Sequence, residues 1–414
     1  MSGRLSRRRL LAGTGVASAA LLAGSGVAGV GVAIGAAAAT PPGDDPGAVL
    51  AFRGPHQGGI ATPPQKALVF AAFDVTTDRA GLAALLSQWT GAAERLTAGQ
   101  PVEGPDGPFD PPPDTGEAVG LPPSRLTLTL GFGPPLFDGR FGLSRRRPAA
   151  LVDLPAFAGD DLDPSLGGGD LCIQACADDP QVAFHAIHDL TRIALGSATI
   201  RYYQVGLART ASGGSAQPSP RNLLGFHDGT ANINPDDRDV MDRFVWVDGS
   251  GDQRWMVGGT YLVVRRIRIH LEAWDRSTLA DQERTIGRVK VSGAPLGSTR
   301  ASEPVDLGAV GYGGQPTIPA DAHIRMAAPA TNGGQAILRR GYSFADGVDP
   351  TTGELDAGLY FLCFQKDPRL QFIPIQTRLA GNDALTPYLL HTGSGIFACP
   401  PGLAEGQTFG HGLV

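Results

Sequence analysis

Hydrophobic residues in the first third of the chain follow two different periods. Residues 66–73 form a nearly continuous apolar run, which is typical of a short buried strand. Residues 78–96 carry apolar side chains at helical spacing, after a Thr-Thr-Asp start signal. Residues 125–132 alternate between apolar and polar side chains and predict a second strand. A Pro-rich loop, 99–123, separates the predicted helix from that strand.

A strand followed by Asp-Pro occurs twice, and this internal repeat is the best indication of the fold. Residues 170–180 and 358–368 match at a constant offset of 188 (358 − 170). Proline suits the first turn of a helix because its missing N–H would have no partner there, and the preceding Asp is a good N-cap. We therefore expect each half to contain a strand that feeds a helix opened by Asp-Pro. Segments 66–96 and 259–279 form a second pair, each an apolar strand followed by a helix.

Two related halves of this kind predict an α+β fold made of duplicated ferredoxin-like domains with antiparallel sheets. We expect the two sheets to pack with a cofactor space between or beside them. The N-terminal domain is predicted at 64–210 and the C-terminal domain at 222–414, with the boundary in Ala211–Arg221, where Ser, Gly and Pro accumulate. Residues 40–63 are predicted to be an extended lead-in, with ordered structure beginning near Gln65.

The N-terminus predicts export. Ser6-Arg7-Arg8-Arg9-Leu10-Leu11 precedes a Gly/Ala-rich apolar run, so residues 1–39 are predicted to be a twin-arginine signal peptide. The run is weakly hydrophobic and interrupted by glycines, which favours a cleaved signal over a retained anchor or a stable membrane span. We therefore expect an extracellular location or one in the periplasm or cell envelope. The twin-arginine route carries folded proteins, which suits a protein that takes up a cofactor before export.

Composition and charge limit the function classes. The chain has 414 residues, of which 42% are hydrophobic and 18% charged, so it is long enough for two packed cores and is unlike a disordered protein. Removal of residues 1–39 takes away four arginines and no acids, which changes the formal charge from −6 to −10 (−6 − 4). An acidic mature protein disfavours nucleic acid and anionic membranes as partners. A homo-oligomer is left open.

The four cysteines do not predict disulfides or a metal site. Cys172 and Cys176 would point to the same face of a strand, four residues and roughly 13 Å apart, too far to bridge. Cys363 lies in an apolar run and is interpreted as a small buried residue. His185 and His188 share a helix face, but we find no arrangement of carboxylate and histidine that completes a metal site, so surface or core roles are expected.

Three segments contain the parts that peroxide chemistry on haem requires. Residues 225–232 read Gly-Phe-His-Asp-Gly-Thr-Ala-Asn, residues 321–325 read Asp-Ala-His-Ile-Arg, and residues 338–342 read Leu-Arg-Arg-Gly-Tyr. A haem that splits peroxide needs an imidazole on iron, a group that moves a proton between the two peroxide oxygens, and a cation. His323, Asp228 and Arg339 fit these roles, although spacing alone cannot choose among the eight histidines.

The order of these segments resembles the dye-decolourising haem peroxidases, including their exported deferrochelatase/peroxidase branch. Segments 169–171, 258–268 and 286–297 also look like that family, so the resemblance runs from roughly Pro64 to the C-terminus. It implies the ferredoxin-like fold predicted above, with haem b (iron protoporphyrin IX) held mainly in the C-terminal half. A thiolate ligand to the haem is not expected, since no cysteine has the surroundings for one.

The resemblance also implies roles for individual residues. His323 would be the proximal haem ligand, with its second ring nitrogen donating to Asp383. Asp228 would be the distal acid/base and Arg339, rather than Arg340, the distal cation. The resemblance further implies that Gly229, Thr230 and Ala231 line the haem edge and that Arg325 is a candidate partner for a haem propionate. Residues 328–330 depart from the family pattern, and His227 is interpreted as incidental.

The predicted function is that of an exported haem peroxidase. It would reduce hydrogen peroxide and oxidise dyes, phenols or other small one-electron reductants. The main alternative is a deferrochelatase-like protein that releases iron from haem for uptake. A non-catalytic haem or ligand carrier is a third interpretation. Surface tyrosines or tryptophans could pass electrons from bulky reductants, but no single aromatic residue is assigned this role.

Overall fold

The computed structural model describes residues 45, 47–105, 107–208 and 221–414. The predicted signal peptide and most of the predicted domain boundary therefore lie outside the described residues. Residues 47–63, within the predicted lead-in, contain no helix or strand. Gln57 and Ile60 are nevertheless buried, and the Gln57 side chain bonds to the backbone of Leu130. Ordered packing thus begins earlier than the sequence analysis predicted, which had placed its start near Gln65.

The N-terminal half is a four-stranded antiparallel sheet with two helices. Its strands follow the spatial order β2-β3-β1-β4, which is the ferredoxin-like order. The elements are β1 (Ala67–Val75), α1 (Arg79–Thr97), β2 (Thr127–Phe132), β3 (Leu171–Ala177), α2 (Pro180–Ile193) and β4 (Ala198–Leu207).

The C-terminal half repeats this arrangement with longer connections. Its strand order is β9-β5-β8, followed by β7 and β6 along the same edge of β8. The elements are α3 (Arg238–Phe244), β5 (Thr260–Ile269), α4 (Leu271–Asp275), α5 (Leu279–Ile286), α6 (His323–Met326), β6 (Leu338–Arg339), β7 (Tyr342–Val348), β8 (Leu355–Gln365), α7 (Phe372–Asn382) and β9 (Leu389–Cys399).

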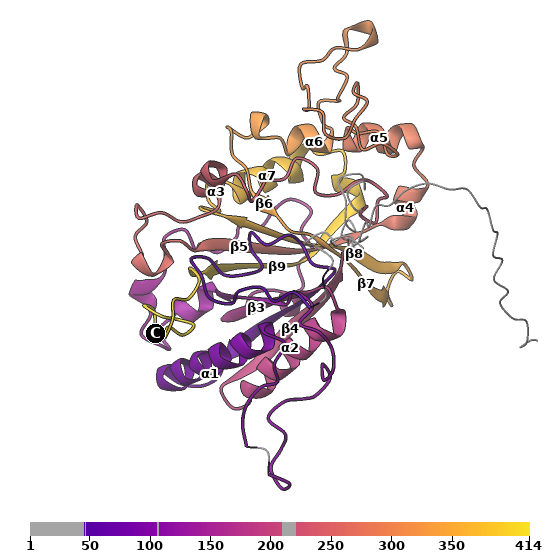
Figure 1. Cartoon of the computed structure of the whole chain (residues 1–414). Helices are drawn as coiled ribbons and strands as arrows, with labels where there is room; N and C mark the ends of the chain where they lie inside the picture. Colours follow the sequence, from indigo (N-terminus) through magenta and orange to yellow (C-terminus); the bar gives the residue numbers. More distant parts are fainter. Residues whose placement is uncertain (1–44, 46, 106, 209–220) are drawn as a thin grey trace, which may run out of the picture. The chain divides into compact units, whose positions relative to one another are not determined.

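The two sheets join at both edges into one closed antiparallel sheet. Phe132 of β2 pairs with Ala398 of β9, and Leu207 of β4 pairs with Ser343 of β7. With the β5–β8 pairing, these contacts close a ring. The predicted duplicated ferredoxin-like α+β fold is confirmed, but the expectation of two separate sheets is wrong, because the outer strands of each half pair with those of the other. In Figure 1, α1 and α2 lie on one side of the closed sheet and α5–α7 on the other.

The interior of the closed sheet is filled with side chains. Phe70 of β1 lies 5.5 Å from the ring of Tyr360 and 5.9 Å from that of Phe397, so both halves contribute to this core. Its neighbour Phe73 points outward and meets Trp89 of α1 at 5.1 Å. Because β1 is buried on both faces, its sequence is a continuous apolar run rather than an alternating one. The space for a cofactor must therefore lie beside the sheets and not between them.

Helix starts agree with the sequence in the N-terminal half and differ in the C-terminal half. Asp78 caps α1 and Asp179 caps α2, as predicted. The second Asp-Pro does not open α7, which begins at Phe372. Asp367 instead accepts the backbone N–H of Arg369 at 2.9 Å, so Asp-Pro forms a turn before the helix. The segment after β5 also forms two short helices, α4 and α5, where one helix was predicted.

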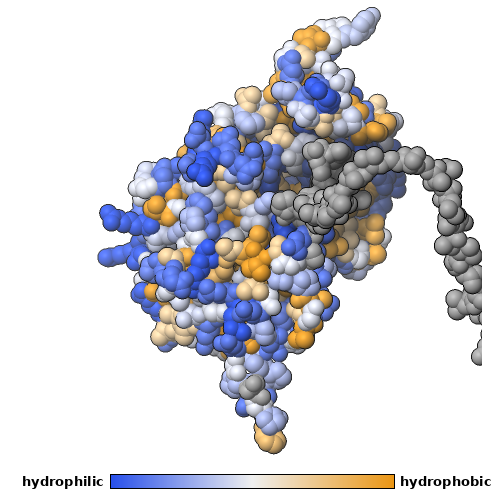
Figure 2. All heavy atoms as spheres, in the orientation of Figure 1, coloured by the Kyte–Doolittle hydropathy of each residue, from blue (hydrophilic) through white to orange (hydrophobic). Residues whose placement is uncertain are grey.

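All four cysteines are free and buried, and the burial of Cys363 confirms its interpretation as a small buried residue. Hydrophilic and hydrophobic residues are interspersed over the face shown in Figure 2. Among the described residues, no helix combines the length and the apolar character needed to cross a membrane.

Candidate haem site

One large cavity lies against the C-terminal half. Its volume is about 520 Å³, within the range of about 300–1,000 Å³ that is typical of ligand sites. Side chains of β5, β8 and α7 form much of its apolar wall, and the N-terminal half contributes only Ala158 and Gly159 among the described residues. Three of the residues singled out by the sequence, Asp228, His323 and Arg339, line this cavity together.

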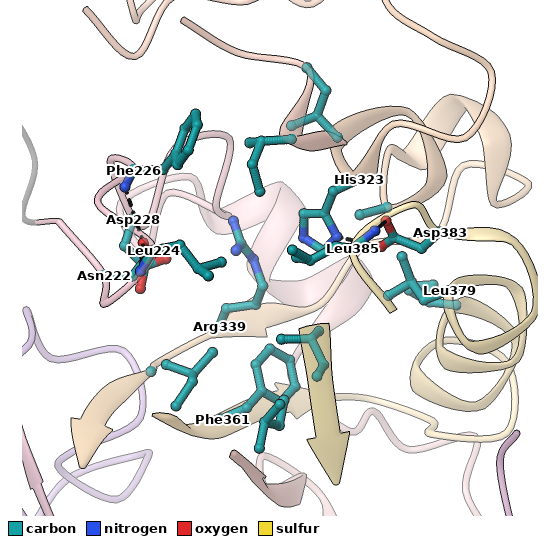
Figure 3. Close-up of a pocket in the computed structure, with 18 of the residues that line it drawn as sticks. Asn222, Leu224, Phe226, Asp228, His323, Arg339, Phe361, Leu379, Asp383 and Leu385 are labelled. Carbon is teal, nitrogen blue, oxygen red and sulfur yellow. Dashed lines mark hydrogen bonds and ion pairs between the residues drawn. The ribbon is translucent and has the colours of Figure 1, made fainter. Parts of the chain in front are cut away.

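His323 enters the cavity from the first position of α6. Its Nδ1 lies 2.6 Å from Oδ2 of Asp383, and the other oxygen of Asp383 accepts the N–H of Leu385 at 2.8 Å. A carboxylate can only accept, so Nδ1 carries the proton and the lone pair on Nε2 is available to an iron ion. Figure 3 shows Asp383 beside the imidazole, on the side away from Arg339. The predicted pairing of His323 with Asp383 is present in the structure.

Several charges act on the pKa of His323. Burial lowers this pKa, but the charge and hydrogen bond of Asp383 outweigh burial, so the net pKa is above its ordinary value. The charge of Arg339 opposes this rise and the charge of Asp228 supports it. The imidazole thus feels all three ionised neighbours, as expected if the four groups surround one cavity.

Asp228 lies in a tight turn at the edge of the cavity. Its Oδ1 accepts the N–H of Gly229 at 2.7 Å. Gly229 has a φ of +74° and Ala231 a φ of +57°. Residues other than glycine rarely adopt a positive φ, and those that do are often found at functional sites. The predicted haem-edge residues Gly229, Thr230 and Ala231 all line the cavity, so this strained turn forms part of its wall.

Arg339 is held in place by the same turn. Its backbone N–H donates to Oδ1 of Asn232 at 2.9 Å, and Nδ2 of Asn232 donates to the carbonyl of Arg339 at 2.8 Å. One guanidinium nitrogen donates to the carbonyl of Thr230 at 2.9 Å. In the view of Figure 3 the guanidinium lies between Asp228 and His323. The strand β6 therefore presents a cation at the centre of the site.

Arg288 is a second cation at the cavity. It is buried, and one guanidinium nitrogen donates to the carbonyl of Gly293 at 2.8 Å. Its Nε has no hydrogen-bond partner among the described residues. Burial lowers the pKa of Arg288, as does the nearby charge of Arg339. Two neighbouring guanidinium groups favour an anionic ligand such as a haem propionate.

Three residues lie elsewhere than the sequence analysis indicated. Arg325, predicted to contact a propionate, does not line the cavity; its guanidinium donates to the carbonyls of Leu307, Ile318 and Pro319. Arg340 is buried and bonds to Thr62 and Gln65 instead of lying at a strand edge. His227, interpreted as incidental, lines the cavity.

Asn232 and Arg288 were not assigned roles from the sequence. Both lie inside segments that resemble the family, and that position was the only available signal for them. Residues 328–330, where the sequence departs from the family pattern, also line the cavity. The set of an imidazole with a carboxylate behind it, a free guanidinium edge and an apolar wall fits a haem.

Comparisons with known proteins agree with this site. Residues 57–208 match the family model of the Dyp-type peroxidase N-terminal domain, and residues 219–404 match that of the C-terminal domain. The chain is 37% identical over 413 residues to a deferrochelatase of Yersinia pestis, covering 98% of this chain and 93% of the relative. It is 38% identical over 375 residues to a deferrochelatase of Escherichia coli, covering 88% and 86%.

Solved structures give the same result. A DyP-type peroxidase from Streptomyces coelicolor has a TM-score of 0.84 and 41% identity, covering 90% of this chain and 99% of that chain. Ferric DtpA from Streptomyces lividans has the same TM-score, identity and coverage. A DyP-type peroxidase from Cellulomonas bogoriensis has a TM-score of 0.81 and 38% identity, covering 89% and 98%. With both family models matched and close relatives spanning nearly its full length, the chain belongs to the Dyp-type peroxidase family and is a haem peroxidase.

Proposed function

We propose that this enzyme reduces hydrogen peroxide and oxidises dyes, phenols or other small one-electron donors, with Asp228 as the acid/base and His323 as the haem ligand. The observation that carries the proposal is the convergence of His323, Arg339 and Asp228 on one cavity. Bound haem would supply the electrons that break the O–O bond. His323 would hold the iron through Nε2, and Arg288 and Arg339 would attract the propionates.

Asp228 would then move the proton. Its carboxylate takes a proton from one peroxide oxygen and returns it to the other, which leaves as water. Arg339 stabilises the negative charge that develops on the leaving oxygen, because a guanidinium stays charged at every relevant pH. The hydrogen bond from Gly229 to Asp228 keeps the carboxylate oriented toward the cavity. The apolar walls exclude water, which strengthens both interactions.

Two substitutions test these assignments. Asp228→Asn should lower the rate of peroxide reduction by about 10²–10⁴-fold, the usual contribution of a general acid/base, with haem content unchanged. Asp236→Asn, in an exposed position of the same loop, is the matched control. His323→Ala should lose most of the haem, measured by the Soret absorbance per chain. Full peroxide turnover in Asp228→Asn, or unchanged haem content in His323→Ala, would refute the corresponding role.

A second candidate function is release of iron from haem for uptake. The relatives from Yersinia pestis and Escherichia coli that are named deferrochelatases favour it. This reaction would use the same cavity but yield free protoporphyrin without peroxide. Anaerobic incubation with haem, followed by fluorescence detection of protoporphyrin, separates the two functions, since a peroxidase alone leaves the haem intact. For either function we propose export by the twin-arginine route to the extracellular space or cell envelope.

A further inference from the structure

Asp114, His185 and Asp189 form a polar cluster outside the haem cavity. Asp114 lies on the loop that connects α1 to β2, whereas His185 and Asp189 lie one turn apart on α2. One side-chain N or O atom from each residue lies within 4.8 Å of those from the other two. None of the three lines the haem cavity, and α2 lies on the opposite side of the sheet from α5–α7 (Figure 1).

This cluster corrects the sequence analysis of His185. The prediction that no carboxylate completes a site around this residue is wrong. Asp189 follows His185 by four positions and therefore shares its helix face. Asp114 arrives from the Pro-rich loop, 71 positions earlier (185 − 114), and no local pattern could have indicated it.

The hydrogen bonds of His185 determine which nitrogen faces the two aspartates. Its Nδ1 lies 2.9 Å from Oε2 of Glu117 and 3.2 Å from the hydroxyl of Thr115. Because a carboxylate only accepts, Nδ1–H donates to Glu117. In the neutral ring, Nε2 then presents a lone pair to Asp114 and Asp189. A carboxylate behind an imidazole is the usual arrangement around a histidine that binds a metal.

Three acceptor atoms thus converge without a donor between them. Nε2 of His185 lies 3.5 Å from Oδ2 of Asp114 and 3.3 Å from Oδ2 of Asp189, and neither contact has the geometry of a hydrogen bond. Asp189 is fully buried, and its Oδ2 receives no hydrogen bond from any described residue. Thr115 and Arg192 face the other oxygen, Oδ1, at 3.1 and 3.5 Å. Arg192 pairs with Oδ1 alone, so a metal ion beside the neutral His185 ring would give the unpartnered Oδ2 a counter-charge.

The separations match those of a metal ion's ligands. Atoms bound at about 2.0–2.2 Å to a tetrahedral Zn²⁺ lie about 3.3–3.6 Å from one another, which agrees with both distances from Nε2 of His185. Two carboxylates and one imidazole suit divalent first-row ions such as Zn²⁺ and Mn²⁺.

We propose that Asp114, His185 and Asp189 bind a divalent transition-metal ion of the Zn²⁺ or Mn²⁺ class, with Glu117 as the positioning residue for the imidazole. The ion would fasten the Pro-rich loop to α2. Asp114 is already oriented for this role, because its two oxygens accept the backbone N–H groups of Val102 and Gly116, each at 2.8 Å. The site is distinct from the haem iron and independent of the proposed peroxidase function.

The test measures metal binding in the haem-loaded protein. After treatment with a chelator, the protein is titrated with Zn²⁺ alone or Mn²⁺ alone, and bound metal is counted by elemental analysis and calorimetry. We expect one ion per chain in addition to haem iron. Asp189→Asn and Asp114→Asn should abolish stoichiometric binding, and Glu117→Gln should weaken it by about 10–100-fold. His411→Gln, which removes an exposed histidine elsewhere, should bind as the unmodified chain does.

A second measurement follows the loop. Removal of the metal should speed hydrogen exchange in residues 99–123 of the unmodified chain, and chelator treatment should have no effect on exchange in Asp114→Asn. Asp114 lies on the loop, and its replacement leaves the buried residue Asp189 intact. The Asp114→Asn variant therefore keeps the test decisive even if Asp189→Asn fails to fold. The proposal is overturned if neither ion binds stoichiometrically, or if Asp114→Asn binds as tightly as the unmodified chain.

Discussion

Replacement of Asp383 by asparagine tests the proposal that His323 is the haem ligand and that Asp383 controls it. Asparagine keeps the size of the side chain, and its oxygen can still accept the N–H of Leu385. The atom that faces His323 then becomes an amide nitrogen, which donates, at 2.6 Å from an Nδ1 that also donates. The imidazole must lose this hydrogen bond or change its tautomer, and in either case the negative charge behind it is gone.

The size of the effect follows from the burial of the pair. The Asp383 side chain is 3% exposed, so solvent does not replace the lost interaction. A hydrogen bond to a charged group contributes about 1.5–3 kcal/mol, which corresponds to roughly 10–150-fold in an equilibrium constant. We therefore expect haem to dissociate from Asp383→Asn about 10–100-fold faster. The iron midpoint potential should also rise, because a less basic imidazole stabilises ferric iron less.

The assay combines haem transfer to an excess of a scavenger protein with a spectroelectrochemical titration. Asp321→Asn is the control, since it removes the same charge two positions from His323 at an exposed site. A purely structural role for Asp383 would change haem loss without moving the potential. If the midpoint potential of Asp383→Asn equals that of the control and its haem off-rate stays within twofold of the control's, the reasoning is wrong.

Three further predictions concern the surroundings of the site. Asn232→Ala removes both bonds to the backbone of Arg339 and should lower kcat for peroxide about 10-fold or more through misplacement of the guanidinium, with KM changed less. Gly358→Ala should destabilise the fold by about 3 kcal/mol in a denaturant titration, since a Cβ there would overlap a backbone oxygen of β5, whereas Gly381→Ala on α7 meets open space and should cost nothing. His391 has a pKa lowered to about 4 by burial and by the charge of a neighbouring arginine, so the unfolded chain binds more protons between about pH 6.5 and 4. The melting temperature should therefore fall as the pH drops through this window, and His391→Gln should reduce that slope.

The fold was predictable because the signals that define it are local. The Asp caps of α1 and α2 and the apolar strands can be read within a few residues of each other. The internal repeat then indicated that the chain contains two related domains. The joining of the two sheets could not be predicted from local signals, because each junction consists of one backbone pair between strands that are distant in the sequence. The start of α7 was mispredicted because Asp-Pro favours a turn as readily as a helix start.

The residues of the candidate site also differ in how well the sequence indicated them. His323, Asp228 and Arg339 were assigned roles because each lies in a segment with a family pattern, and all three line one cavity. Arg325 was misplaced because proximity in sequence to His323 says little about the direction of a long side chain. Asp114 and His185 meet only through tertiary structure, since β2 and β3 lie between them in the sequence. Long-range contacts were therefore predictable only where a family pattern marked both partners, as for His323 and Asp383.

The mutual pairing of outer strands makes the two halves interdependent. Almost all of the haem cavity belongs to the C-terminal half, so that half looks sufficient for catalysis when its side chains alone are considered. Cutting it free would expose β7 and β9 along their unpaired backbone groups, which are templates for aggregation. The N-terminal half therefore covers the strand edges of the C-terminal half. A shortened enzyme made from residues 222–414 would need other protection of these edges before it could remain in solution.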